Sequence, residues 1–263
     1  MSFRRMKKMA AILLAAALLL LPYACTGESG EDGEDRVREL CDFLQGHYGI
    51  GVLTGEECLF IPRDNIEIQL NYSEVSDTGE AVFKSSRYEE LLMLLDDVLS
   101  VYPPSFFSRF APQDGDEPGG LRFLLVDRLY YGGSPDSGMF YHAGGGWMDI
   151  WLSASGARER TIHHEIGHAL EYLIRMEDPE AFSDWESLNP EGFEYGEDAA
   201  SEDGAERDRE PEDWFVREYS KHDVWEDRAT VFEAIMLKDA EWWEARPHLQ
   251  KKAEVLQRYV DLP

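Results

Sequence analysis

The segment TIHHEIGHAL, residues 161–170, contains three of the seven histidines of the chain and one glutamate. His164 and His168 are four positions apart, so on a helix both imidazoles project from one face and can reach a single metal ion. Glu165 would lie beside that ion, where a carboxylate can take a proton from a metal-bound water. Imidazole pairs of this kind suit zinc, although other first-row divalent ions also fit. His163 would point away from the pair, and we expect it to pack or to support a ligand from behind.

The surroundings of this motif predict a buried helix. Between Thr161 and Leu170, Glu165 is the only acidic residue, and there is no lysine or arginine. A protein interior tolerates charged groups when they are paired or coordinate a metal. The sequence therefore favours a metal site. The alternative is a buried helix whose histidines are satisfied by hydrogen bonds.

Two histidines leave a catalytic zinc site incomplete, because such sites usually have three protein ligands and one open position. One subclass takes its third ligand from a residue six positions beyond the second histidine, after a glycine. Glu171 and Ile174 occupy these two positions here, which excludes that subclass. The third ligand must therefore come from farther along the chain.

A second segment, FVREYSKHDVWEDRATVFEAIM at residues 215–236, carries a resemblance to a known family. With the histidine helix it resembles the gluzincin metallopeptidases, and it is most similar to the bacterial branch that includes the catalytic domain of lethal-factor toxin. In that branch a helix with Glu-x-x-Ala followed by Phe supplies a glutamate ligand, and a tyrosine seven residues earlier lines the zinc site. Glu226, Ala229 and Phe232 match this helix, and Tyr219 matches the tyrosine.

The resemblance implies one Zn²⁺ ion held by three side chains, His164, His168 and Glu226. It also implies that Glu165 and Tyr219 are the catalytic residues. The residue types agree, since a carboxylate is favoured in the first turn of a helix and a tyrosine hydroxyl can donate a hydrogen bond to an oxyanion. The alternative for Tyr219 is packing at a helix end. Three residues remain as competing ligands: Asp227, Glu233 and His222.

This chain departs from the family at one position behind the ligands. Relatives often have an acidic residue four positions after the ligand glutamate, where it orients the first histidine. Thr230 stands there in this chain. Glu233 would lie on the same helix face and could substitute for the missing carboxylate.

The strand WMDIWLS, residues 147–153, comes just before the histidine helix. We expect it at the edge of the sheet, where an extended peptide can pair with the main chain. The alternative is an ordinary amphipathic strand.

The order of elements predicts an α+β fold. Apolar residues at helical spacing predict helices at 36–46, 87–103, 157–176, 225–245 and 247–260. Apolar runs between turn residues predict strands at 58–62, 66–70 and 121–130, and two more within 140–153 on either side of the turn at Gly144–Gly146. With the resemblance, we expect one zincin-like metallopeptidase domain over residues 36–263, with a mixed sheet, the H-E-x-x-H helix and a helical C-terminal half.

One stretch of this domain is unusually acidic. Residues 177–213 hold sixteen acidic residues and two arginines. We expect a surface excursion rather than a second domain. A lid, a specificity loop and a simply solvated chain are all compatible with this composition.

Residues 1–24 begin with four basic side chains, which an apolar run over residues 9–21 follows. This pattern predicts a signal peptide whose apolar part is too short to span a membrane comfortably. Cys25 comes next, in an arrangement that resembles a bacterial lipoprotein signal and implies a lipid on that cysteine. We expect residues 25–35 to form an acidic tether. The protein would then be extracytoplasmic, either anchored in the cell membrane through Cys25 or secreted.

The chain has a formal net charge of −28. A surface this acidic repels nucleic acid and anionic lipid headgroups, so we expect no nucleic-acid partner and no membrane contact beyond the lipid anchor. Cys41 and Cys58 are expected to form a disulfide in an exported protein, and two buried thiols are the alternative.

These features predict a zinc-dependent endopeptidase that hydrolyses peptide bonds in a protein or peptide substrate. The main alternative is a non-catalytic lipoprotein that keeps the fold as a binding scaffold. Glu165 argues against it, because metal retention alone does not need that carboxylate. A metal-dependent hydrolase acting on a non-peptide bond also fits the ligand set. Nothing in the sequence indicates the oligomeric state.

Overall fold

The fold is known from a computed structural model. It describes residues 30–70, 72–75, 81–83, 85–103, 105–111, 119–142, 146–196, 208–209 and 213–260. The predicted signal peptide and Cys25 lie outside these residues. Among the helices of the described part, none is both long and apolar enough to cross a membrane.

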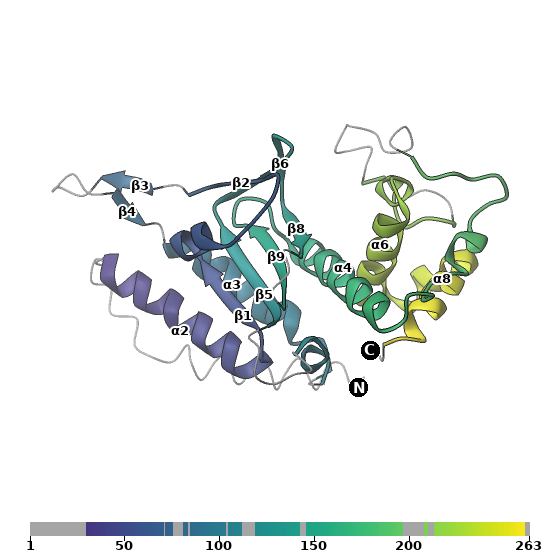
Figure 1. Ribbon diagram of the computed structural model, residues 1–263, viewed down its shortest axis with the longest axis horizontal. Coiled ribbons are helices and arrows are strands. Elements are labelled where there is room, and N and C mark those ends of the chain that lie inside the picture. The colour runs from purple at the N-terminus through teal and green to yellow at the C-terminus, as the bar shows by residue number, and fades with distance from the viewer. Residues whose placement is uncertain are drawn as a thin grey trace.

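A four-stranded mixed sheet forms the centre of the molecule (Figure 1). Its strands, in spatial order, are β1 (Gly51–Thr54), β5 (Gly120–Val126), β9 (Trp147–Ser153) and β8 (Gly138–Tyr141). The first three are parallel, and β8 pairs antiparallel with β9. The prediction that residues 147–153 form the edge strand is therefore wrong. β9 is an interior strand because it pairs with β5 on one side and with β8 on the other.

The two faces of this sheet are covered differently. In β5, Phe123 and Leu125 face a large core, whereas Leu124 and Val126 face a small one. This alternation follows from the two-residue period of a strand. The helices α2 (Gly30–Tyr48), α3 (Ser85–Leu99) and α4 (Glu159–Glu177) contribute to the large core.

The small core lies under a three-stranded antiparallel sheet. Its strands are β2 (Ile66–Gln69), β6 (Arg128–Tyr131) and β7 (Ser134–Asp136), in that spatial order. A separate two-stranded pair consists of β3 (Tyr72–Val75) and β4 (Ala81–Phe83).

The two cysteines of the described part do not form the predicted disulfide. Cys41 and Cys58 are both free and both buried. Cys41 on α2 belongs to the large core, and Cys58 belongs to the small core. The central sheet lies between them. Burial raises the pKa of each thiol to about 12, so both stay protonated and behave as small apolar groups.

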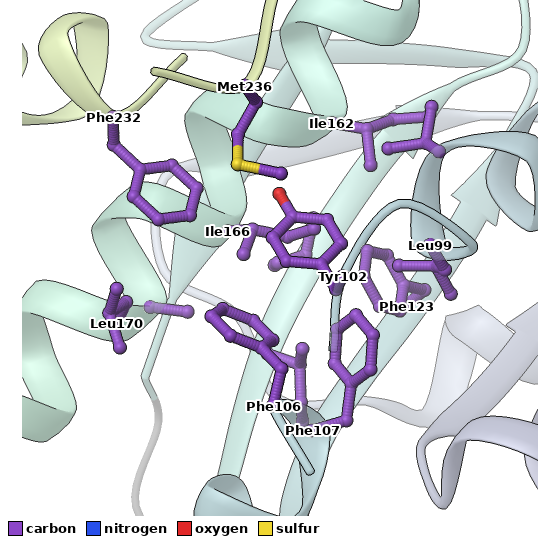
Figure 2. Close-up of a cluster of buried hydrophobic side chains, with 14 of the residues drawn as sticks. Leu99, Tyr102, Phe106, Phe107, Phe123, Ile162, Ile166, Leu170, Phe232 and Met236 are labelled. Atoms are coloured by element: carbon purple, nitrogen blue, oxygen red, sulfur yellow. The ribbon is translucent and has the colours of Figure 1, made fainter. Parts of the chain in front are cut away.

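The helix α4 lies between the sheet and the C-terminal helices α6 (Val224–Leu237) and α8 (Pro247–Gln257) (Figure 1). Its apolar face, made by Ile162, Ile166 and Leu170, packs with Tyr102 and other aromatic side chains (Figure 2).

The crossing of α4 and α6 is close because α4 has a glycine there. A Cβ built on Gly167 would lie 3.2 Å from the Cβ of Phe232 and 3.3 Å from the Cα of Ala229. The glycine inside the histidine motif therefore serves the approach of the two helices.

The mixed sheet, the helix that carries the motif and the helical C-terminal half all agree with the predicted architecture. Several bounds differ. The helix expected at 36–46 begins at Gly30, so the last part of the tether predicted at 25–35 is helical. Acidic residues are favourable at a helix N-terminus, which explains how this segment can be both acidic and helical.

Two other local predictions need correction. Residues 58–62 were expected as a strand, but the 3₁₀ helix η1 occupies Gly55–Phe60. Residues 225–245 were expected as one helix, but α6 ends at Leu237 and α7 (Ala240–Glu244) begins a new one after Asp239, whose carboxylate caps it. The closing helix α8 begins at Pro247, as predicted.

The acidic excursion is only partly a surface feature. Of residues 177–213, the structure describes 177–196, 208–209 and 213. Ala181, Phe182 and Trp185 are buried in the large core, so the first part of the excursion is anchored. The remaining residues of this predicted excursion lie outside the described part.

Candidate metal centre

The helix α4 brings two histidines together in a buried setting. The Nε2 atoms of His164 and His168 are 3.2 Å apart, and the two rings stand edge to face at 89°. Both side chains are almost fully enclosed. The four-residue spacing produces this arrangement, because residues one turn apart lie on the same helix face.

The first turn of α6 brings a carboxylate to the same point. Asp223 caps this helix by accepting hydrogen bonds from the backbone N–H groups of Trp225 and Glu226. The Oε2 atom of Glu226 is 2.9 Å from His164 Nε2 and 3.6 Å from His168 Nε2. Within the described residues, this trio is the one group of potential ligands whose donor atoms converge.

The distances among the three ligand atoms fit a zinc ion. Ligands placed tetrahedrally at about 2.0–2.1 Å from one zinc are about 3.3 Å from each other. The three observed separations, 3.2, 2.9 and 3.6 Å, surround this value. Glu226 Oε2 is also buried, and its close contacts are with the two imidazole nitrogens, so a cation between the three groups would suit it. The donor set therefore suits one zinc.

Charge is strongly coupled across these three groups. Burial alone would lower the pKa of His164, but Glu226 raises it to about 10. Glu226 raises the pKa of His168 in the same way against burial. Burial would raise the pKa of Glu226, but the two histidines hold it well below its usual range. The site thus attracts positive charge, either as protons or as a metal cation.

Glu165 lies next to the histidine pair and against the edge strand. Burial raises its pKa to about 7, although His164 and His168 partly oppose this shift. A Cβ built on Gly138 of β8 would lie 3.1 Å from the Cγ of Glu165 and 2.5 Å from the Cγ2 of Thr161. The absence of a side chain at Gly138 therefore lets β8 pass close to this carboxylate.

Tyr219 belongs to the 3₁₀ helix η5 (Glu218–Lys221), which precedes α6. Its ring centroid is 6.1 Å from that of His164. The guanidinium of Arg217 lies 5.5 Å from the centre of the same ring. The structure therefore brings the ring of Tyr219 beside His164, and its predicted catalytic role stays a prediction.

The three competing ligands lie elsewhere. Asp227 Oδ2 accepts hydrogen bonds from the side chains of Trp185, Tyr195 and Lys252. His222 Nδ1 is 3.0 Å from the carboxylate of the neighbouring Asp223. Glu233 lies near the Nδ1 side of the His164 ring, whereas Glu226 and His168 lie near its Nε2 side. The Oε2 atom of Glu233 is 3.6 Å from Nδ1 of His164. This position agrees with the predicted replacement for a carboxylate at position 230.

His163 serves in packing, as predicted. It is fully buried, and its Nδ1 is 2.6 Å from the hydroxyl of Tyr102. Burial lowers its pKa to about 4, so the ring is neutral at physiological pH.

Sequence reasoning missed Arg217 at this site, and it missed one contact farther along α4. Arg217 lies behind His164, but no spacing rule connects residues that are 53 positions apart. Tyr172, one turn beyond His168 on α4, has its hydroxyl 3.0 Å from Nδ1 of His142, which follows β8. A lone histidine after a strand gives no sequence signal of this contact.

Comparisons with known proteins add little to this geometry. No family model and no curated protein matches the chain. Among solved structures, the chain is similar to a protein from Bacteroides caccae that is described as a "putative zinc-binding metallo-peptidase". The TM-score is 0.48 at 14% identity, over 88% of this chain and 87% of that chain. A similarity at this level does not assign a family.

Proposed function

We propose that this protein is a zinc-dependent endopeptidase, a gluzincin similar to the lethal-factor branch. One observation carries the proposal: His164, His168 and Glu226 converge at the separations that one zinc requires, with Glu165 beside them. Two imidazoles and one carboxylate leave a fourth position open, which is the arrangement of catalytic rather than structural zinc.

Bound here, zinc would polarise a carbonyl and lower the pKa of a coordinated water. Glu165 is suited to move the proton, because its raised pKa of about 7 allows a carboxylate both to accept and to release one near neutral pH. It would take a proton from the attacking water and pass it to the leaving amine. Tyr219 beside His164 would donate a hydrogen bond to the oxyanion that develops on the substrate carbonyl.

The edge strand β8 supports a peptide as the substrate. Among the described strands, β8 pairs with β9 alone, so no described strand pairs with its other edge. An extended peptide could pair with this edge of β8. Because Gly138 has no side chain, the main chain of such a peptide would lie close to Glu165. The strand at 147–153 cannot take this role because both of its sides are paired.

Export also belongs to the proposal. The basic start, the apolar run and Cys25 support a lipoprotein that is anchored outside the cytoplasm, or a secreted protein. Its acidic composition supports a protein or peptide partner rather than nucleic acid.

The direct test uses the purified chain without its signal, loaded with zinc, and a library of peptides. We expect cleavage by the parent and a loss of about 10²–10⁴-fold in Glu165→Gln, with zinc retained. A different outcome is that the parent binds zinc, but Glu165→Gln cuts every peptide that the parent cuts, or neither cuts any. A binding scaffold would then explain the fold better. Cleavage of non-peptide esters or amides alone would favour a different hydrolase.

A further inference from the structure

Arg175 lies on the helix face that carries the two histidines of the metal site. With 3.6 residues per turn, positions 164, 168 and 175 of α4 fall within about 40° of one another around the helix axis. Arg175 is seven residues beyond His168, so its Cα is about 10 Å farther along that axis. The Cα–Cβ bonds of a helix tilt toward its N-terminus, which is the direction of the metal site from Arg175.

Trp225 holds the guanidinium of Arg175. The two groups are 4.7 Å apart, and Trp225 directly precedes the candidate ligand Glu226. Within the described residues, Arg175 has neither a hydrogen bond nor an ion pair, whereas every other buried or half-buried arginine there donates at least one hydrogen bond. Glu171, one turn earlier on α4, pairs with Arg228 instead. Arg175 therefore presents five N–H donors that no described acceptor uses.

The edge strand β8 leads from the metal site toward Arg175. Its first residue, Gly138, lies against Glu165, since a Cβ built on it would be 3.1 Å from the Cγ of that side chain. His142, which follows its last residue, lies at Tyr172, with Nδ1 3.0 Å from the tyrosine hydroxyl. Tyr172 is three positions before Arg175 on α4, so the two are neighbours on the helix surface. A peptide paired with β8 would run along this line from Glu165 toward Arg175.

An arginine held in this way suits a carboxylate. The guanidinium is planar and always charged, and its fork of donors matches the two oxygens of a carboxylate. The half-exposed ring of Trp225 attracts the cation without using any of these donors. Because the chain has a formal net charge of −28, long-range attraction does not bring a carboxylate here. A preference for acidic peptides must therefore come from direct contact with this guanidinium.

We propose that Arg175, held by Trp225, binds a carboxylate of the substrate and is a specificity-determining residue. An extended peptide advances about 3.3 Å per residue, so the distance from His168 to Arg175 corresponds to about three residues. The carboxylate belongs to a Glu or Asp side chain about that far from the scissile bond, or to the C-terminus of a short peptide. The inference rests on the proposed function, because it concerns the substrate of that site.

The test uses the zinc-loaded chain without its signal and pairs of peptides that differ only by Glu or Gln at one position. In the parent, Glu should raise kcat/KM by about tenfold over Gln at one position, because a hydrogen bond to a charged group is gained there. Arg175→Met should bring this ratio close to one, and Arg175→Lys should keep part of it. Copies with an amidated C-terminus show whether the terminal carboxylate is the group that binds.

A matched control removes an arginine elsewhere. Arg38 on α2 forms an exposed ion pair with Asp35, so Arg38→Met makes the same change in net charge far from the metal site. It should keep the Glu/Gln ratio of the parent. Arg175 is also in the last turn of α4, where a cation stabilises a helix. A role in stability alone would lower the unfolding temperature of Arg175→Met without changing the ratio.

Binding to the zinc-loaded Glu165→Gln variant separates the inference from the proposed peptidase. Glu peptides should bind it about tenfold more tightly than their Gln partners, and adding Arg175→Met should remove the difference. Cleavage without a Glu preference, or with one that survives Arg175→Met, keeps the peptidase and overturns the inference. Glu-selective binding that depends on Arg175, without any cleavage by the parent, keeps the inference and overturns the peptidase. A parent that neither cuts nor binds these peptides overturns both.

Discussion

Glu226 and Asp227 are adjacent on α6, and both carboxylates are enclosed, yet their surroundings are opposite. Glu226 faces two imidazole nitrogens, with its Oε2 2.9 Å from His164 Nε2 and 3.6 Å from His168 Nε2. Asp227 Oδ2 accepts three hydrogen bonds, from Trp185, Tyr195 and Lys252. The difference shows what the surroundings of a buried carboxylate decide. Surrounded by hydrogen-bond donors, as Asp227 is, it holds segments of the chain together. Facing other potential ligands, as Glu226 does, it can bind a metal.

The anchor also serves the ligand. The fully buried Lys252 on α8 donates to Asp227 and to the backbone oxygen of Trp214, so α8 and the chain before η5 are joined to α6. Trp185 joins the first part of the acidic excursion to the same carboxylate. The helix that carries Glu226 is thereby fixed by contacts that do not involve the candidate metal ligands.

The largest effect is expected at the anchor. Asp227→Ala should lower the free energy of unfolding by about 3–5 kcal/mol, because Lys252 would remain buried without its partner. Denaturant unfolding in the presence of a chelator measures this without any contribution from metal. Adding Lys252→Met should recover part of the loss. An unchanged free energy in Asp227→Ala would mean that the cluster is not an anchor.

A smaller loss of stability, together with weaker zinc binding, is expected from a substitution where α4 and α6 cross. Gly167→Ala places a methyl group against Phe232 and Ala229, where α4 and α6 cross. Overpacking of this kind costs about 1–3 kcal/mol of unfolding free energy. The displaced α6 would also move Glu226 away from the histidines and weaken zinc binding. Loss of stability with unchanged zinc affinity would show that the crossing does not set the ligand geometry.

The pH dependence of zinc affinity should depend on Glu226 and not on Asp227. Burial opposes charge on His164 and His168, but Glu226 raises the pKa of both, and that of His164 to about 10, so near neutral pH zinc must displace a proton at least from His164. Zinc affinity should therefore rise between pH 6 and 8, by about tenfold per pH unit for each proton released. Calorimetry in buffers of different ionisation enthalpy counts these protons.

The same titration on two variants provides the control. Asp227→Asn should keep the slope of the parent, because Asp227 does not face the histidines. Glu226→Gln should flatten the slope, since the pKa of both histidines would fall. An equal slope in all three proteins would contradict the coupling between Glu226 and the histidines.

The sequence predicted the parts of the site that depend on local spacing. The i, i+4 relation of His164 and His168 needs only a helix. Glu226 lies 58 positions beyond His168, so its choice over Asp227 depended on the family resemblance. Spacing cannot separate adjacent carboxylates, because the donors around Asp227 come from segments far apart in the chain.

The errors about the edge strand, the cysteines and Arg217 share one physical cause, which is that they concern contacts across the fold. Nothing in the strands 138–141 and 147–153 marks which one is the edge, and the pairing of β9 with both β5 and β8 shows that it is 138–141. Cys41 and Cys58 are close in sequence, but the sheet separates them. Arg217 behind His164 is likewise a long-range contact.

Zinc content is the most direct test of the central claim, that Glu226 and not its neighbour completes the metal site. The parent, Glu226→Gln and Asp227→Asn should be purified side by side, loaded with zinc, dialysed and analysed for metal per chain. The account predicts one zinc in the parent and in Asp227→Asn, and much less than one in Glu226→Gln, whose weakened site loses zinc on dialysis. Zinc retained by Glu226→Gln, or lost from a folded Asp227→Asn, would contradict it.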